Sequence, residues 1–248
     1  MRNLKLEIEY DGTDYCGWQA QTRNKHKKSI QQTLEKTLRK ILQEKIRLIA
    51  SGRTDAGVHA FAQVANFKTK SNIALDKLQR ALNGLLADDI TINKIEEVNL
   101  DFHSRFSAKS KVYRYTILNR AYPSALLRNT VCHYHYPLDT RVMQKEARVL
   151  LGRHNFTSFQ ACDKIERDPV RTIKSIKITK DKEKIYIDIE ADGFLYNMVR
   201  NIVGTLLEIG RGKLAKGSLE KILLAKDRRL AGPAAPAKGL CLIKVKYK

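Results

Sequence analysis

The chain has 248 residues, of which 43% are hydrophobic and 29% charged, a balance typical of a soluble globular protein rather than a disordered one. Lys and Arg total 47 against 26 Asp and Glu, so the formal net charge is +21. A compact fold resists this much like charge, which favours a polyanionic partner but does not separate RNA from DNA or from an anionic membrane.

Membrane insertion and secretion are both disfavoured by the sequence. No apolar run approaches the length that spans a bilayer, and residues 1–7 lack the apolar core of a signal peptide. The four cysteines contain no C-x-x-C pair, which argues against a zinc ribbon. Cys132–His135 could ligate a metal, but its alternation is more typical of a strand. We therefore expect a cytoplasmic protein with no membrane partner and no metal.

The first half of the chain begins with a predicted strand. Apolar and charged residues alternate from Leu4 to Tyr10, and a turn at residues 11–14 follows. Ser29 and Gln32 form a capping-box pattern, so a helix is predicted from there to about Glu44. Further segments predict two short strands and a second helix, at residues 47–50, 63–68 and 75–86. This order indicates an α+β layer, one sheet covered by helices on one face.

The second half repeats this pattern. Alternation predicts strands at 111–118, 173–180, 184–190 and 240–247. The second and third of these form a hairpin that turns at residues 181–183. Helical spacing predicts helices at 141–151 (ended by Gly152), 199–209 and 218–225. We therefore expect two similar α/β halves, residues 1–105 and 106–248, with antiparallel or mixed sheets, flanking helices and a cleft between the halves.

The segment from Ser51 to Ala60 has neither helical nor strand periodicity and holds two glycines, an Arg, an Asp and a His. Glycines at this spacing suit a tight loop whose backbone approaches a ligand closely. Arg53 lies two residues before Asp55, and an Arg neighbour keeps a carboxylate ionised when it is partly desolvated. An ionised carboxylate can attack an electrophilic carbon. For an isolated R-x-D, a purely structural Arg–Asp pair in a loop would be the preferred explanation.

Five ordered blocks resemble the tRNA pseudouridine synthase A family, and together they cover nearly the whole chain. They are Tyr10–Thr13 with Gly17–Gln19, Ser51–Ala60, Phe102–Ala108 with Lys111–Tyr115, Asp192–Arg200 with Ile202–Thr205, and Ala231–Pro233 with Ala235–Leu240. One departure is Ala234, where the family more often has Thr, and this bears on one local contact rather than on the chemistry. The resemblance implies the pseudouridine synthase fold and an isomerase that converts uridine to pseudouridine in tRNA.

The resemblance also implies roles for particular residues. Asp55 would be the nucleophile, attacking either the uracil ring or the ribose anomeric carbon, and Arg200 would pair with it. Tyr113 would stack on a target base that has left the helical stack, and Leu240 would pack against that base. Arg53 would fill the gap left by the extruded nucleotide or hold a phosphate. Read without the resemblance, Tyr113 and Leu240 are ordinary core residues.

The family acts on uridines 38, 39 and 40 of the anticodon stem-loop, so the resemblance implies tRNA as partner and a homodimer as the working form. Basic residues support an RNA partner, with nine Lys or Arg in residues 21–47 and eleven in residues 211–248. The isomerisation needs no redox or nucleotide cofactor. Gly212-Lys213 lacks the other residues of a phosphate-binding loop.

Two other functional classes remain as alternatives. One is an RNA-binding or chaperone module that keeps the fold without turnover, against which the intact Asp55, Arg200 and Tyr113 argue. The other is a zinc-dependent nucleobase deaminase, which requires a His/Cys zinc site with a nearby Glu that the sequence lacks.

Overall fold

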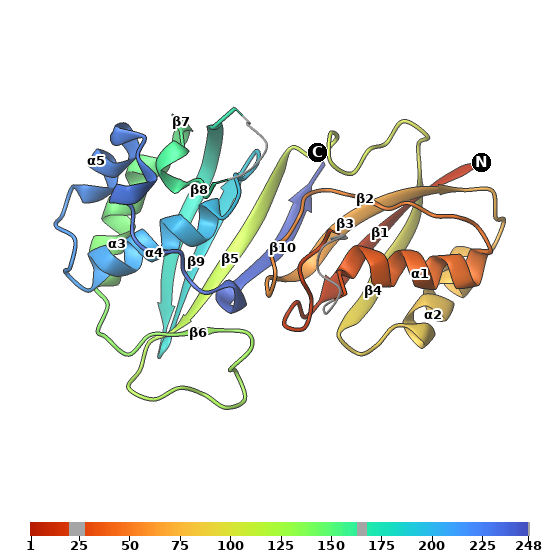
Figure 1. The fold of residues 1–248 in the computed structure, drawn as a ribbon, viewed down its shortest axis with the longest axis horizontal. Coiled ribbons are helices and arrows are strands. Elements are labelled where there is room, and N and C mark those ends of the chain that lie inside the picture. The colour runs from red at the N-terminus through yellow and green to blue at the C-terminus, as the bar shows by residue number, and fades with distance from the viewer. Residues whose placement is uncertain (20–27, 163–167, 248) are drawn as a thin grey trace. The chain divides into compact units, whose positions relative to one another are not determined.

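The structure is a computed structural model that describes residues 1–19, 28–162 and 168–247 (Figure 1). The chain forms two compact units: unit 1 holds Met1–Lys109 and Cys241–Lys248, and unit 2 holds Ser110–Leu240. The expected division into 1–105 and 106–248 differs from this at the C-terminus, because the last strand pairs with a strand of unit 1. The basic run at residues 23–28 lies, apart from Lys28, outside the described residues.

Unit 1 is built on a sheet in the order β4-β1-β3-β10. Strand β1 (Arg2–Tyr10) is antiparallel to both β3 (His59–Thr69) and β4 (Ile90–Val98). The short strand β2 (Ile49–Ala50) and β10 (Leu240–Lys246) also pair with β3, antiparallel and parallel respectively. The predicted alternation along β1 is confirmed, because its apolar side chains are buried and its charged ones are half-buried.

Helices α1 (Ile30–Leu42) and α2 (Leu75–Leu85) pack together against the apolar face of this sheet (Figure 1). The predicted capping box at the start of α1 is present: the Gln32 amide donates to Ser29 Oγ (3.1 Å), and the Ser29 amide donates to Gln32 Oε1 (3.3 Å). Such a cap stabilises a helix by about 1 kcal/mol. The fully buried leucines of the two helices form the core of unit 1 with those of β1: Leu34, Leu38, Leu78, Leu82, Leu4 and Leu6.

Strand β4 is the one long strand of unit 1 that the sequence pattern did not predict. Its buried residues are Ile90, Ile92 and Ile95, so the alternation breaks after Ile92. The pairing with β1 explains the break, because Glu7 lies opposite Lys94 while Ile8 lies opposite Ile92, which leaves Asn93 as an extra residue. A β-bulge of this kind returns Ile95 to the buried face although its spacing is odd.

Unit 2 is built on an antiparallel sheet in the order β5-β9-β8-β7. The predicted hairpin is confirmed as β8 (Val170–Asp181) and β9 (Lys184–Ala191), and β5 (Ser110–Leu118) lies on the other side of β9. Two short strands complete the sheet, β6 (Cys132–His133), parallel to the end of β5, and β7 (Gly152–Asn155).

Three helices gather beside this sheet: α3 (Thr140–Ala147), α4 (Met198–Gly210) and α5 (Ser218–Ala225) (Figure 1). The predicted helix at 141–151 was too long, because α3 ends at Ala147 and its chain continues as a 3-10 turn before Gly152 begins β7. Short 3-10 helices occur at Arg148–Leu150, Thr157–Phe159, Arg228–Leu230 and Ala237–Gly239. None of the helices in the described ranges is long and apolar enough to cross a bilayer.

Candidate active site

The loop between β2 and β3 in unit 1 carries Asp55. Along it, buried residues alternate with accessible ones: Ser51, Thr54 and Val58 are buried, Asp55 is half-buried and Arg53 is exposed. The buried positions anchor the backbone, while the two charged side chains of the motif remain accessible to a ligand. A carboxylate on an anchored loop is pre-organised, which is a general requirement for a catalytic group.

Side chains of β1 and β3 hold this loop through hydrogen bonds. Ser51 Oγ donates to Gln63 Oε1 (2.7 Å), and Gln63 Nε2 donates to the Gly52 carbonyl (3.0 Å). The hydroxyls of Tyr10 and Thr54 lie 2.7 Å apart. Burial raises the pKa of Tyr10 far above its ordinary value, so this tyrosine stays neutral and serves as a structural hydrogen-bonding group.

The N-terminal block of the resemblance packs directly against the loop. The Trp18 amide donates to the Thr54 carbonyl (3.0 Å), and Gly17 has φ +99°. A Cβ on Gly17 would lie 2.6 Å from that same carbonyl oxygen, so only glycine allows this approach. Gly12 is similarly constrained, since its Cβ would lie 2.1 Å from the Val58 carbonyl oxygen. Two sequence blocks that are far apart in the chain therefore form one structural element around Asp55.

Arg200 lies in the first turn of α4 in unit 2 and is the one residue of that helix that is not buried. Its guanidinium is held at two atoms, because Nε donates to the Ala235 carbonyl (2.7 Å) and Nη1 donates to Asn197 Oδ1 (2.9 Å). Asn197 adopts a left-handed backbone conformation (φ 59°) at the helix start, which asparagine tolerates better than most residues. The sequence did not single out Asn197 or Ala235 as supports of Arg200, although both lie within the blocks of the resemblance.

The segment that supplies Ala235 crosses α4 at a point where glycine is required. A Cβ on Gly204 would lie 1.7 Å from the Pro233 carbonyl oxygen, and the Gly232 amide donates to Thr205 Oγ1 (2.9 Å). These contacts place the Ala235 carbonyl beside Arg200. Ala234, the residue that departs from the family pattern, is exposed, so its side chain takes no part in this packing.

Tyr113 lies on β5, opposite Ile189 of β9, and is only 7% exposed. Its ring meets the ring of Phe194 edge to face, with centroids 5.1 Å apart and planes at 86°. The sequence did not single out Phe194 individually, although it lies in the block that contains Arg200. Leu240 is 6% exposed and begins β10.

The neighbouring Tyr115 is a structural residue. Its hydroxyl donates to the Pro236 carbonyl (2.8 Å), and its ring lies where a Cβ on Gly239 would stand. Each unit thus holds part of the residue set expected from sequence: Arg53 and Asp55 in unit 1, and Tyr113, Arg200 and Leu240 in unit 2.

Metal ligation finds no support in the described part of the chain, where no three His, Cys, Asp or Glu side chains are grouped to hold an ion. Cys132, in the segment considered as a possible ligand set, is buried. Burial raises the pKa of its thiol, which is the opposite of what a metal-binding or nucleophilic thiolate requires.

Comparison with known proteins identifies the family. A family model described as tRNA pseudouridine synthase matches residues 7–107 and 147–248. The chain is 47% identical over 247 residues to tRNA pseudouridine synthase A of Acetivibrio thermocellus, and 48% identical over 247 residues to tRNA pseudouridine synthase A 2 of Clostridium perfringens, with 100% of both chains covered in each case. A solved structure of a Cbf5-Nop10-Gar1 complex is similar with a TM-score of 0.36 and 10% identity, covering 96% of this chain and 48% of that one, too weak a likeness to support a conclusion. The matched blocks include the anchored loop around Asp55 and the supported arginine at the start of α4, and on this evidence the chain belongs to the tRNA pseudouridine synthase family.

Proposed function

We propose that this protein is a tRNA pseudouridine synthase that converts uridine to pseudouridine at positions 38, 39 and 40 of the anticodon stem-loop. Full-length relatives named tRNA pseudouridine synthase A support the reaction and the substrate. The net charge of +21 suits a polyanionic substrate. The observation that carries the proposal is the Asp55 loop, which is anchored on both sides and presents its carboxylate at half-burial.

In the proposed reaction the bond between N1 of uracil and C1′ of ribose breaks, and a bond between C5 and C1′ forms. The hydrogen on C5 leaves as a proton and N1 gains one, so atoms balance without a redox or nucleotide cofactor. Asp55 acts as nucleophile either at the uracil ring or at C1′. An anchored carboxylate serves both routes, because it needs no reorientation before attack.

The remaining residues would position the base and the nucleophile. Arg200 would pair with Asp55 and keep it ionised, and its two hydrogen bonds to Ala235 and Asn197 suit a residue that must hold one orientation. Tyr113 would stack on the flipped uracil, with Phe194 holding the tyrosine ring from its edge.

Leu240 would pack against the same base. Arg53 is exposed and would occupy the space left by the flipped nucleotide or hold a phosphate. We further propose that the protein works as a homodimer in the cytoplasm.

The test uses unmodified tRNA labelled with tritium at C5 of uridine. Formation of pseudouridine releases that tritium to solvent. Wild-type protein should release it, whereas Asp55→Asn should bind tRNA and release it at least about a thousandfold more slowly, because an amide is not a nucleophile. Asp14→Asn, which changes an exposed Asp between the two parts of the N-terminal block, is the matched control and should behave as wild type.

Tritium release by Asp55→Asn at an appreciable rate would remove Asp55 from the nucleophile role. Tight tRNA binding without release by the wild type would instead favour the RNA-binding or chaperone alternative.

A further inference from the structure

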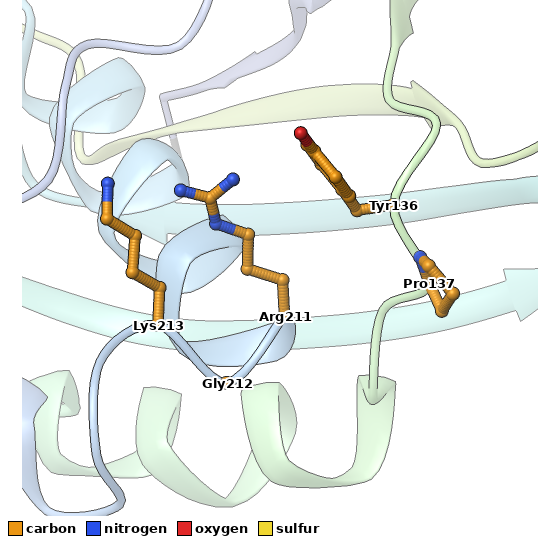
Figure 2. A pocket seen from close by; sticks show the side chains of 5 residues that line it. All are labelled: Tyr136, Pro137, Arg211, Gly212 and Lys213. Carbon is orange, nitrogen blue, oxygen red and sulfur yellow. The ribbon is translucent and has the colours of Figure 1, made fainter.

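An open pocket in unit 2 lies at the opposite end of α4 from Arg200. Its volume is about 480 Å³, and it is lined by two short segments, Tyr136–Pro137 and Arg211–Lys213. Figure 2 shows the side chains of Lys213 and Arg211 extending in the same direction, with the Tyr136 ring standing across from them on the facing segment. Arginine, lysine and an accessible aromatic ring are the side chains that proteins use to hold an unpaired nucleotide.

The aromatic wall of this pocket is accessible and held in place. Tyr136 is 46% exposed, and the guanidinium carbon of Arg211 lies 5.2 Å from the centroid of its ring. His135 also contacts it, with ring centroids 3.9 Å apart. A ring supported in this way offers a stacking surface without the entropy cost of ordering a free side chain.

The positive charges of Arg211 and Lys213 are partly neutralised by the carboxylate of Glu208. Glu208 pairs with Arg211 (2.8 Å) and with Lys213 (3.2 Å), but its own side chain is only 11% exposed while that of Lys213 is 65% exposed. Nearby, Asp139 is the exposed N-cap of α3 and keeps its negative charge, and Lys216 is a second exposed cation beside Lys213. Arg211, Lys213 and Lys216 against Glu208 and Asp139 leave the pocket region with a net positive charge.

The C-terminal end of α4, where the helix dipole is negative, does not strongly repel an anion at this pocket. The carbonyl of Glu208 accepts from the Lys213 and Leu214 amides, and that of Gly210 accepts from the Asp139 amide. With these carbonyls satisfied and two cations beside them, the helix end repels a phosphate little.

The distance from this pocket to the residues proposed for catalysis can be measured along two elements of unit 2. Arg200 and Arg211 are eleven residues apart on and just beyond α4, which at 1.5 Å per residue is about 17 Å. Along β5, Tyr113 lies five residues before Leu118, a distance of about 17 Å. The Leu118 carbonyl accepts from the amide of Tyr134, which lies two residues before Tyr136 of the pocket. A nucleic-acid helix that rises about 3 Å per base pair covers this distance in about six base pairs.

We propose that Tyr136, Arg211 and Lys213 form a second RNA contact, at which a nucleotide of the substrate outside the reacting stem-loop stacks on Tyr136 while its phosphate pairs with Lys213. This proposal rests on the proposed function. An enclosed small-molecule site is a poorer fit, because such sites surround most of their ligand whereas this pocket is open on one side.

The test compares two RNAs that contain the target uridine: full-length tRNA and a hairpin whose stem is shorter than about six base pairs. Tyr136→Ala should weaken binding of full-length tRNA about tenfold and raise its KM with kcat unchanged, because a lost stack costs uniform binding. Binding of the short hairpin should not change. Tyr136→Phe keeps the ring and should stay within about twofold of wild type.

Lys213→Ala should reduce the slope of log K against log salt for full-length tRNA by about 0.7, as expected for one lost contact to the phosphate of an unpaired nucleotide. Lys180→Ala, which removes an exposed lysine of β8, is the matched control and should leave that slope unchanged. Thermal unfolding of each variant tests whether loss of the ion pair between Lys213 and Glu208 destabilises the fold and by itself explains the change in RNA binding.

Wild-type protein that forms no pseudouridine in either RNA would refute the proposed function. If wild-type protein turns over both RNAs, two results would refute only the second contact. In one, Tyr136→Ala binds full-length tRNA as tightly as wild type does; in the other, it binds both RNAs equally weakly. A change of oligomeric state in Tyr136→Ala with RNA affinity unchanged would also overturn the proposal, in favour of a protein interface.

Discussion

The loop that carries Asp55 and the helix that carries Arg200 hold their charged side chains in different ways. The loop has no regular structure. Hydrogen bonds from Trp18 and Gln63 hold its backbone, and one between Tyr10 and Thr54 holds a side chain of the loop. Helix α4 is buried at every residue except Arg200, and most of its buried side chains are apolar, so packing holds it.

In both regions a glycine allows a second segment to approach the backbone closely, Gly17 for the loop and Gly204 for the helix. The close approach at a glycine is common to both regions. The loop is otherwise held mainly by hydrogen bonds, whereas apolar packing holds α4 and hydrogen bonds to Ala235 and Asn197 hold the Arg200 guanidinium. Mutations that remove a close approach should therefore act alike in both units. A lost hydrogen bond should disturb the backbone in the loop, but at α4 it should disturb mainly the Arg200 side chain.

The largest loss of stability is expected for Gly204→Ala. Its Cβ would lie 1.7 Å from the Pro233 carbonyl oxygen, so either α4 or the segment that crosses it must move. We expect unfolding to become easier by about 3 kcal/mol or more, measured by chemical denaturation. The control is Gly84→Ala in α2, where a Cβ meets nothing within 4 Å, and it should raise stability by about 0.5–1 kcal/mol.

Gln63→Met should damage the loop more than the fold. Methionine keeps the volume but leaves Ser51 Oγ and the Gly52 carbonyl without the hydrogen bonds that Gln63 provides. We expect a loss of about 2–4 kcal/mol in stability, with kcat for tritium release falling more than KM rises. A variant with lowered stability but unchanged kcat would show that the loop does not depend on this anchor for its reactive geometry.

Arg200→Lys should change activity with little change in stability. Lysine keeps the charge but does not reproduce the planar group that donates to both Ala235 and Asn197. We expect kcat to fall about tenfold and the free energy of unfolding to change by less than about 1 kcal/mol. Arg80→Lys, which alters an exposed pair with Asp76 on α2, is the control and should leave kcat unchanged.

The smallest effect is expected for Tyr10→Phe, which removes the hydrogen bond to Thr54 and should cost about 1 kcal/mol at neutral pH. Burial raises the pKa of Tyr10 above the unfolded value of about 10, so the unfolded chain ionises first as pH rises. The stability that this tyrosine contributes is therefore present below pH about 10 and is lost above it. Denaturation at pH about 8 and about 11 should show a smaller alkaline loss in Tyr10→Phe than in wild type, and an equal loss would contradict this assignment.

Much of the secondary structure was readable from sequence because local patterns specify it. The alternation in β1, the capping box of Ser29 and Gln32, and the hairpin of β8 and β9 each depend on residues close together in the chain. Strand β4 was not predicted because a bulge at Asn93 breaks its alternation, and the pairing with β1 determines where that bulge lies. The end of α3 was misplaced because Gly152 opens a strand rather than closing the helix.

The same distinction applies to the candidate site. The residues of the Ser51–Ala60 segment carry the family resemblance, and that resemblance marked Asp55 as the proposed nucleophile. Its supports were not readable, since Gln63 and Trp18 reach the loop from other elements of the sheet and the N-terminal block. The supports of Arg200 and the pocket of Tyr136 and Arg211 likewise join segments distant in sequence. Local composition records which groups are chemically able to act, whereas the contacts that orient them exist only once the chain has packed.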